Sequence, residues 1–261
     1  MKQTICIATL TLVFSALTSA QTPAQAGAAT GNPGQPTLTP DQIARQRAQQ
    51  EQLANDWPNL ARYRDANRDL PPVSASESRV VFMGDSITEL WDRDSGKFFA
   101  SKGYLGRGIG GQTTPQMLIR FRPDVIALKP KAVVILAGTN DIAGNTGLST
   151  LEMIQDNMAS MVELAQKNGI KVVLSSVMPV CDYIQNQTKR RPNEQIIALN
   201  KWMKDYAASH DAIYLDYYTP MLDDKGVFKQ ELTYDGLHPN SAGYDIMMPL
   251  AQNAVDKALG K

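Results

Sequence analysis

Cysteine is scarce in this chain of 261 residues, which contains only Cys6 and Cys181. Cys6 lies in a predicted export signal that is removed on maturation, so Cys181 is the single cysteine of the predicted mature chain. One cysteine excludes an intramolecular disulfide. We expect Cys181 to be buried and inert, because free cysteine behaves as a small apolar residue; a reactive thiol is the alternative.

An excess of one charge sign is also absent, since 26 Lys and Arg residues balance 26 Asp and Glu residues. This balance argues against a nucleic-acid-binding or anionic-membrane-binding surface, which requires a basic excess. The apolar run near the N-terminus, "ICIATLTLVFSAL", is shorter than the roughly 20 residues of a spanning helix. Lys2 precedes it and small residues ending at Ala20 follow it. We therefore predict a signal peptide over 1–20, an exported protein (periplasmic or secreted) and no stable membrane insertion.

Composition then divides the rest of the chain. Residues 21–38 contain Ala, Gly, Pro, Thr and Gln but no charge, which is typical of a flexible linker. A helical segment is predicted over 39–72, with one helix capped by Thr39 and a second beginning near Asp56. We expect this segment to pack on the main domain, predicted over 73–261, with a partner-binding arm as the alternative.

Short apolar runs alternate with helical patterns in the main domain. The runs are rich in β-branched residues and nearly continuous in hydrophobicity, as in strands buried on both faces of a parallel sheet. The alternation predicts an α/β fold, a three-layer α/β/α sandwich, in which ligands bind beyond the carboxyl ends of the strands. The predicted strands cover 79–84, 132–138, 171–177 and 212–218, and the predicted helices cover 113–121, 149–169, 193–210 and 241–260.

The predicted helix over 149–169 is rich in methionine. Its apolar residues recur at helical spacing, which indicates core packing and not a metal or cofactor site. The residues expected in the core are Met153, Ile154, Met158, Met161, Val162 and Leu164.

Polar residues suited to acyl transfer gather after the predicted strands. Ser86 follows the first strand in "GDSIT", Asn140 follows another in "GTND", and Asp235 and His238 lie in "DGLHPN". A nucleophilic serine requires a base, a group that orients the base, and donors for an oxyanion. Each motif alone has an ordinary alternative, because serine caps helices and Gly, Asn and Asp are common in turns.

Histidine restricts the choice of base, because the chain has only His210 and His238. His210 ends a predicted helix, where an imidazole interacts with terminal carbonyls. His238 is therefore the predicted base, and Asp235 can accept a hydrogen bond from its Nδ1. A solvated histidine in an Asp-capped turn is the alternative.

The glycine-rich stretch "GRGIGGQTT" offers Gly111 as a second backbone oxyanion donor beside the Ser86 N–H. Gly106, Gly108 and Gly111 also match the dinucleotide fingerprint G-x-G-x-x-G. That fingerprint requires a strong preceding strand and an acidic residue ending the next one, and Asp124 instead opens "DVIAL". Nucleotide binding is therefore not predicted, and neither a metal nor an organic cofactor is expected.

Four blocks, "GDSIT", "GIGGQT", "GTND" and "DGLHP", occur in this order and together resemble the GDSL-type esterases, also called SGNH hydrolases, over about residues 79–250. The resemblance implies a flavodoxin-like parallel sheet of about five strands, with a second strand in "YLGRGIG" (104–110). It implies that Asp85 and Asp141 hold loops in place. It also implies site roles: Ser86 as nucleophile, Gly111 and Asn140 as oxyanion donors, His238 as base and Asp235 as its orienting carboxylate.

The function predicted from these residues is hydrolysis of short-chain carboxylic esters through an acyl-enzyme, with small-molecule or carbohydrate esters as substrates and acetyl groups on carbohydrate as a candidate. A sugar O-acetyltransferase using the same residues is one alternative, and a non-catalytic carbohydrate-binding protein on this fold is another. The sequence leaves the oligomeric state open. Lys189, Arg190 and Arg191 belong to a segment, 179–195, that follows a predicted strand; they favour a solvated basic loop or contact with an anionic or polyol substrate.

Overall fold

The computed structural model describes residues 39–74, 76–94 and 98–261. The chain divides into two compact units, Met1–Ile43 and Ala44–Lys261. The strands are β1 (Val80–Gly84), β2 (Tyr104–Gly108), β3 (Ala132–Leu136), β4 (Lys171–Ser175) and β5 (Ala212–Leu215). The helices are α1 (Pro40–Asn55), α2 (Ala61–Arg68), α3 (Ser86–Asp94), α4 (Phe98–Lys102), α5 (Thr114–Asp124), α6 (Thr139–Ile142), α7 (Leu151–Lys167), α8 (Asn193–Ser209) and α9 (Ser241–Ala258), with short 3₁₀ turns at η1 (Ile126–Leu128), η2 (Thr219–Met221) and η3 (Gln230–Leu232).

The five strands form one parallel sheet in the order β2-β1-β3-β4-β5. This is the flavodoxin-like strand order, in which the chain reverses its direction of winding between β1 and β3. β1 and β3 are buried at every position, because both lie in the interior of the sheet and helices cover both faces. The predicted α/β/α fold and its five-stranded sheet are confirmed.

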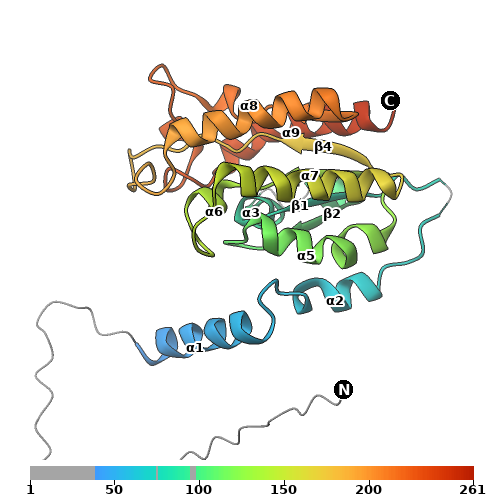
Figure 1. Cartoon of the computed structure of the whole chain (residues 1–261), viewed down its shortest axis with the longest axis horizontal. Helices are drawn as coiled ribbons and strands as arrows, with labels where there is room; N and C mark the ends of the chain where they lie inside the picture. Colours follow the sequence, from blue (N-terminus) through green and yellow to red (C-terminus); the bar gives the residue numbers. More distant parts are fainter. Residues whose placement is uncertain (1–38, 75, 95–97) are drawn as a thin grey trace, which may run out of the picture. The chain divides into compact units, whose positions relative to one another are not determined.

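Alternate strand residues supply two separate cores. Val133 and Ile135 belong to the core shared with α5, α7 and α8, whereas Val134 and Leu136 belong to the core shared with α3, α4 and α9. The period of two follows from the pleat of the strand. α5, α7 and α8 pack beside one another on their face of the sheet (Figure 1).

β2 is the strand that hydrophobic pattern alone does not predict, and it was expected only from the family resemblance. Its sequence, YLGRG, contains two glycines, and it lies at an edge of the sheet. A Cβ atom at Gly108 would lie 2.2 Å from the Glu89 nitrogen, so glycine permits α3 to lie against this strand. Gly106 and Gly108 therefore serve strand packing and do not form the turn of a dinucleotide fingerprint.

Two helical predictions need correction. Met153 was expected in the core but is 51% exposed, because the buried stripe of α7 runs through Ile154, Met158, Met161 and Val162, and Met153 lies to one side of it. The second N-terminal helix begins at Ala61 and not near Asp56; the Asp56 carboxylate accepts hydrogen bonds from the backbone of Leu60 and Ala61. In α1, the Thr39 hydroxyl accepts from the Gln42 N–H at 3.2 Å, as expected of a cap.

The predicted signal peptide (1–20) and linker (21–38) lie outside the described residues. Within the described ranges, none of the helices combines the length and the apolarity that crossing a membrane requires. Cys181 is buried with a free thiol, as expected, and burial raises its pKa.

Candidate active site

The candidate site lies at the carboxyl ends of β1 and β3, two neighbouring strands at the point where the strand order reverses. Ser86 begins α3 two residues after β1 ends, and Asn140 lies in α6 after β3. In doubly wound sheets this crevice is where ligands bind. The fold therefore brings together residues separated by more than fifty positions in the sequence.

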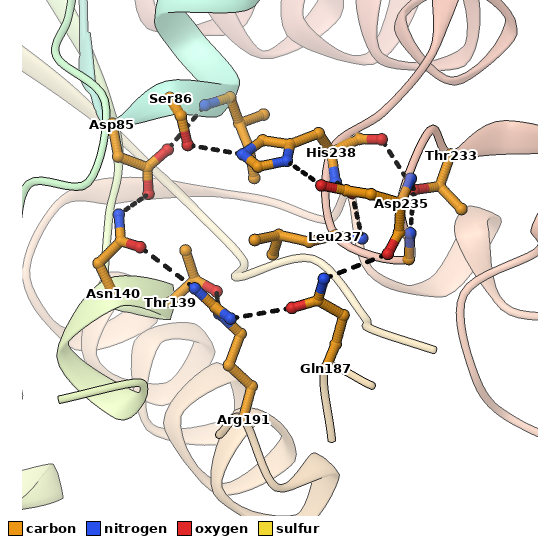
Figure 2. Close-up of polar contacts among 12 residues, drawn as sticks. Asp85, Ser86, Thr139, Asn140, Gln187, Arg191, Thr233, Asp235, Leu237 and His238 are labelled. Carbon is orange, nitrogen blue, oxygen red and sulfur yellow. Dashed lines mark hydrogen bonds and ion pairs between the residues drawn. The ribbon is translucent and has the colours of Figure 1, made fainter. Parts of the chain in front are cut away.

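Ser86, His238 and Asp235 form one hydrogen-bonded line (Figure 2). Ser86 Oγ lies 2.9 Å from His238 Nε2, and His238 Nδ1 lies 2.8 Å from Asp235 Oδ2. A carboxylate only accepts hydrogen bonds, so the Nδ1 atom carries the proton and Nε2 is free to accept from the serine hydroxyl. This arrangement can remove a proton from Ser86.

The turn that carries His238 is held by its own residues. Asp235 Oδ1 accepts the backbone N–H of Leu237 at 2.9 Å and that of His238 at 2.8 Å. The Thr233 hydroxyl donates to the His238 carbonyl at 2.8 Å. Partial burial acts to raise the pKa of Asp235, but hydrogen bonds from the backbone and ring of His238 and from Leu237 outweigh it, and the net pKa is lowered. Asp235 is therefore ionised and fixed against the imidazole.

Asp85 lies directly before Ser86 and is fully buried. Its Oδ1 accepts the Ile87 N–H at 2.9 Å, which orients the first turn of α3. Its Oδ2 accepts from Asn140 Nδ2 at 3.4 Å. Burial raises the pKa of Asp85 to about 6, because a buried carboxylate loses its hydration.

Asn140 is held at both ends of its side-chain amide. Its Nδ2 donates to the Gln112 carbonyl at 3.0 Å, in addition to the longer bond to Asp85. Its Oδ1 accepts from Asn145 Nδ2 at 3.0 Å and from Arg191 Nη2 at 3.4 Å. The hydrogen bond to Asp85 links Asn140 to the residue that directly precedes Ser86. The surrounding donors and acceptors fix the orientation of the Asn140 amide.

Gly111 lies on the exposed loop between β2 and α5. Its φ of +75° is in the left-handed region, which glycine adopts without strain. Asn145 Nδ2 donates to the Gly111 carbonyl at 3.0 Å and also to Asn140 Oδ1, so one amide links both candidate oxyanion donors. The loop passes close to the serine, because a Cβ atom built on Gly110 would lie 3.8 Å from Ser86 Cβ.

Arg191 is the residue whose surroundings the sequence interpretation described wrongly. Lys189 and Arg190 are exposed, as a solvated basic loop predicts, but Arg191 is buried, 5% exposed, and does not face solvent. Its guanidinium donates to Thr139 Oγ1 at 3.2 Å, to Gln187 Oε1 at 3.0 Å and to Asn140 at 3.4 Å.

Gln187 completes a polar chain across the site. Its Nε2 donates to the Asp235 carbonyl at 3.1 Å while its Oε1 accepts from Arg191 (Figure 2). The chain connects the histidine turn with Asn140. No motif in the sequence indicates this connection; the only signal was a cluster of cations after a strand.

His210 and Asp141 make the contacts that the sequence predicts for them. His210 ends α8, where its Nδ1 lies 2.9 Å from the Tyr206 carbonyl and its ring stacks on Tyr206 at 3.8 Å. Asp141 accepts hydrogen bonds from the backbone N–H and hydroxyl of Thr114, which tie α6 to the start of α5. Burial raises the pKa of Asp141. Across the part of the chain with described coordinates, no group of three or more His, Cys, Asp or Glu side chains is arranged to hold a metal ion.

Known proteins resemble this chain over the same region. A solved GDSL-like lipase from Bacteroides thetaiotaomicron is 43% identical, with a TM-score of 0.74, over 78% of this chain and 100% of its own. An uncharacterised lipoprotein of Bacillus subtilis (strain 168) is 38% identical over 121 residues, which are 40% of this chain and 49% of that protein, about half its length. An acetylxylan esterase of Geobacillus stearothermophilus is 24% identical over 203 residues, 66% of this chain and 91% of that enzyme.

The sequence model of the GDSL-like lipase/acylhydrolase family matches residues 82–246. This range contains the loops that carry Ser86, Asn140 and His238. The resemblance noted in the sequence and the predicted class of ester hydrolase are thereby confirmed at the level of the family. The chain belongs to the GDSL-like lipase/acylhydrolase family.

Proposed function

We propose that this protein is a serine esterase that hydrolyses short-chain carboxylic esters through an acyl-enzyme. The observation that carries the proposal is the hydrogen-bonded line from Ser86 through His238 to Asp235. A serine hydroxyl is a weak nucleophile by itself, and a histidine within 2.9 Å supplies the base that activates it. The lowered pKa of Asp235 keeps the negative charge that stabilises the imidazolium formed during the reaction.

The oxyanion is assigned to the backbone N–H groups of Ser86 and Gly111 and to Asn140 Nδ2. Two features support this assignment. The Nδ2 bond to Asp85 is 3.4 Å long, beyond the usual range for N–H···O bonds, so this hydrogen is available to a stronger acceptor. Ser86 also begins α3, and the N-terminus of a helix favours negative charge.

The reaction then proceeds in two steps. Ser86 Oγ forms a bond to the ester carbonyl carbon while His238 Nε2 takes the hydroxyl proton, and the carbonyl oxygen becomes the oxyanion. Collapse of this intermediate breaks the ester C–O bond, and His238 returns the proton to the leaving alcohol. Water attacks the acyl-enzyme, His238 takes and returns one proton, and the carboxylic acid and the Ser86 hydroxyl are released.

Acetyl groups on carbohydrate are the substrates that we favour. The acetylxylan esterase from Geobacillus stearothermophilus supports this choice, since its similarity to this chain extends over 91% of its length. Uncharged, soluble esters of this kind also suit a site that is partly open to water, since the His238 and Asp235 side chains are 23% and 22% exposed.

Export of the protein is part of the same proposal. The charged, apolar and small-residue segments of 1–20 are typical of a signal peptide, and a similar protein from Bacillus subtilis is named a lipoprotein. We propose that 21–38 is a linker and that 39–72 forms an N-terminal helical segment of the exported chain, followed by the hydrolase domain over 73–261.

The first test is the release of p-nitrophenol from acetyl, butyryl and octanoyl esters by the wild type and by Ser86→Ala. The wild type is expected to hydrolyse the acetyl ester best, and Ser86→Ala is expected to lose roughly 10⁴-fold or more in kcat, as other serine hydrolases do without their nucleophile. Ser160→Ala is the matched control, because its hydroxyl donates to the Asp156 carbonyl within α7, away from the site.

Several outcomes would contradict the proposal. Full activity in a folded Ser86→Ala variant would remove Ser86 as nucleophile. Transfer of the acetyl group to an added sugar, with no release of acetic acid when the sugar is left out, would indicate O-acetyl transfer. Saturable glycan binding without turnover of any ester would indicate a binding protein on this fold.

A further inference from the structure

A pocket of about 260 Å³ opens beside the candidate oxyanion loop. Its lining includes Gly110, Gly111 and Asn145 together with Trp57 and Leu53. Gly110 approaches Ser86, and Asn145 donates to both Gly111 and Asn140. The pocket therefore adjoins the reacting groups, and part of its wall comes from the N-terminal helical segment.

The turn that carries Trp57 is fixed to the oxyanion loop by two buried glutamines. Gln112 Nε2 donates to the Pro58 carbonyl at 2.7 Å, and Gln116 Nε2 donates to the Trp57 carbonyl at 2.8 Å. Gln112 follows Gly111 directly, and its own carbonyl accepts from Asn140. The position of Trp57 is thus set by the same residues that hold the candidate oxyanion donors.

A second set of contacts holds α2 against β2 and α3. The Tyr63 hydroxyl donates to the Gly108 carbonyl, and the Arg107 guanidinium lies 4.8 Å from the centre of the Tyr63 ring. Arg62 pairs with Glu89 at 3.1 Å, and Glu89 accepts the Gly110 N–H at 2.8 Å. The segment from Asp56 to Arg68 is therefore packed against β2 and α3 beside the site. It contributes to the site as well as linking α1 to the sheet.

The chemistry of the lining selects a class of ligand. None of the described residues that line the pocket carries a charge. The lining combines residues with amide or hydroxyl side chains and residues with apolar or aromatic side chains: Gln52, Asn59, Gln116 and Thr146, and Leu53, Ile109 and Trp57. Among these described residues, no charged side chain lines the pocket to balance a charged ligand. A wholly apolar acyl chain would cover amide groups that can form further hydrogen bonds, because Gln116 Nε2 has two hydrogens and donates one to the Trp57 carbonyl. A neutral polyol with one apolar ring face satisfies both kinds of surface.

We propose that this pocket binds a sugar ring of the ester substrate, with the ring stacked on Trp57 and its hydroxyls bonded to the surrounding amides. This inference rests on the proposed function, since it assigns the carbohydrate portion of the substrate to one side of the proposed esterase site. It also gives the N-terminal helical segment a role in substrate choice.

The test compares two substrates in the full chain and in Trp57→Ala. One substrate is p-nitrophenyl acetate, and the other is a mono-O-acetylated methyl β-xylopyranoside. Loss of one aromatic contact is expected to lower kcat/KM for the sugar ester, mainly through KM, by roughly threefold to tenfold more than it lowers kcat/KM for p-nitrophenyl acetate. Trp57→Phe is expected to recover most of the loss. Tyr183→Ala is the matched control, because Tyr183 is 39% exposed against 36% for Trp57 and does not line the pocket.

The outcomes separate this inference from the proposed function. If the wild type hydrolyses neither substrate, the proposed function fails. If the wild type hydrolyses both and Trp57→Ala leaves the sugar ester unaffected, only the sugar subsite is wrong. Equal losses on both substrates would contradict a sugar subsite, because the effect of Trp57 would then not depend on the sugar ring.

Discussion

The two halves of the candidate site are held in place by interactions of very different range. In the acid–base half, Asp235 holds His238 by bonds between residues three positions apart. In the oxyanion half, Asn140 is held by Gln112 and Arg191, 28 and 51 positions away. The first half is built by a single turn, whereas the second requires that several loops be folded first.

The difference matters for how each half responds to mutation. A turn that satisfies its own backbone donors keeps its shape when distant contacts change, because its hydrogen bonds are local. A side chain held by several distant groups loses its orientation when any one of them moves. Changes in distant contacts should therefore leave the Asp235–His238 turn in place but disturb the orientation of Asn140.

Asp235→Asn is expected to have the largest effect on the acid–base half. The Asn Oδ1 keeps the bonds to the backbone of Leu237 and His238, but its Nδ2 replaces the oxygen that faces His238 Nδ1. The imidazole then adopts the wrong tautomer and cannot take the Ser86 proton, with a loss of about 10⁴-fold in kcat. Steady-state kinetics measure kcat, and a thermal melt shows whether the variant is folded. Activity within tenfold of the wild type would show that Asp235 does not orient the base.

Asn140→Ala tests the oxyanion half. Removal of one oxyanion donor is expected to cost roughly 10²–10³-fold in kcat with little change in KM, because the lost bond forms only in the transition state. Asn168→Ala, which removes an exposed amide at the end of α7, is the control. Near-normal turnover in a folded Asn140→Ala variant would remove Asn140 from the oxyanion site.

Asp85→Asn tests the buried carboxyl between the two halves through stability and not through rate. Burial raises the pKa of Asp85 from 3.8 to about 6, so its favourable contribution is fully present below pH 3.8 and is lost as the pH rises through about 6. The wild type should therefore lose about 3 kcal/mol of unfolding free energy from this group across that interval. Asn does not titrate, so the variant should lack this part of the pH dependence.

Urea denaturation of both proteins between pH 3.5 and pH 7, about the range in which a buried Asp titrates, provides the measurement. The difference in unfolding free energy between the wild type and Asp85→Asn isolates this one group, because all other groups titrate in both proteins. A difference that does not vary with pH would show that the pKa of Asp85 is the same in the folded and unfolded states, and that burial does not raise it.

Much of the fold followed from local pattern. The runs that became β1, β3, β4 and β5 are continuous and β-branched, as buried parallel strands are. β2 escaped this pattern because its glycines serve the close approach of α3, a contact invisible in a hydrophobicity profile. The helical spacing of apolar residues over 149–169 predicts Met153 in the core, yet the face of α7 that is buried depends on where α5 and α8 pack.

The candidate site likewise combines residues that the sequence identifies with residues whose role appears only in the folded chain. Ser86, Asn140, Asp235 and His238 were identified as candidates from motif order and from the scarcity of histidine. Arg191 was interpreted as solvent-facing or substrate-facing, because a cationic cluster in a loop carries no signal of burial. Trp57 and the glutamines that fix its turn were not identified, since their role exists only where the N-terminal segment meets the oxyanion loop.

The sequence by itself determined the strand and helix alternation, the motif blocks, and the Asp235–His238 turn, because each depends on residues close together in the chain. Tertiary structure decided that Ser86 meets His238 across 152 positions, that Arg191 is buried against Asn140, and that Trp57 lines the pocket beside Gly111. The physical reason is that pairings between distant residues depend on how the sheet and its loops close in space, whereas turns and strands depend on nearest neighbours.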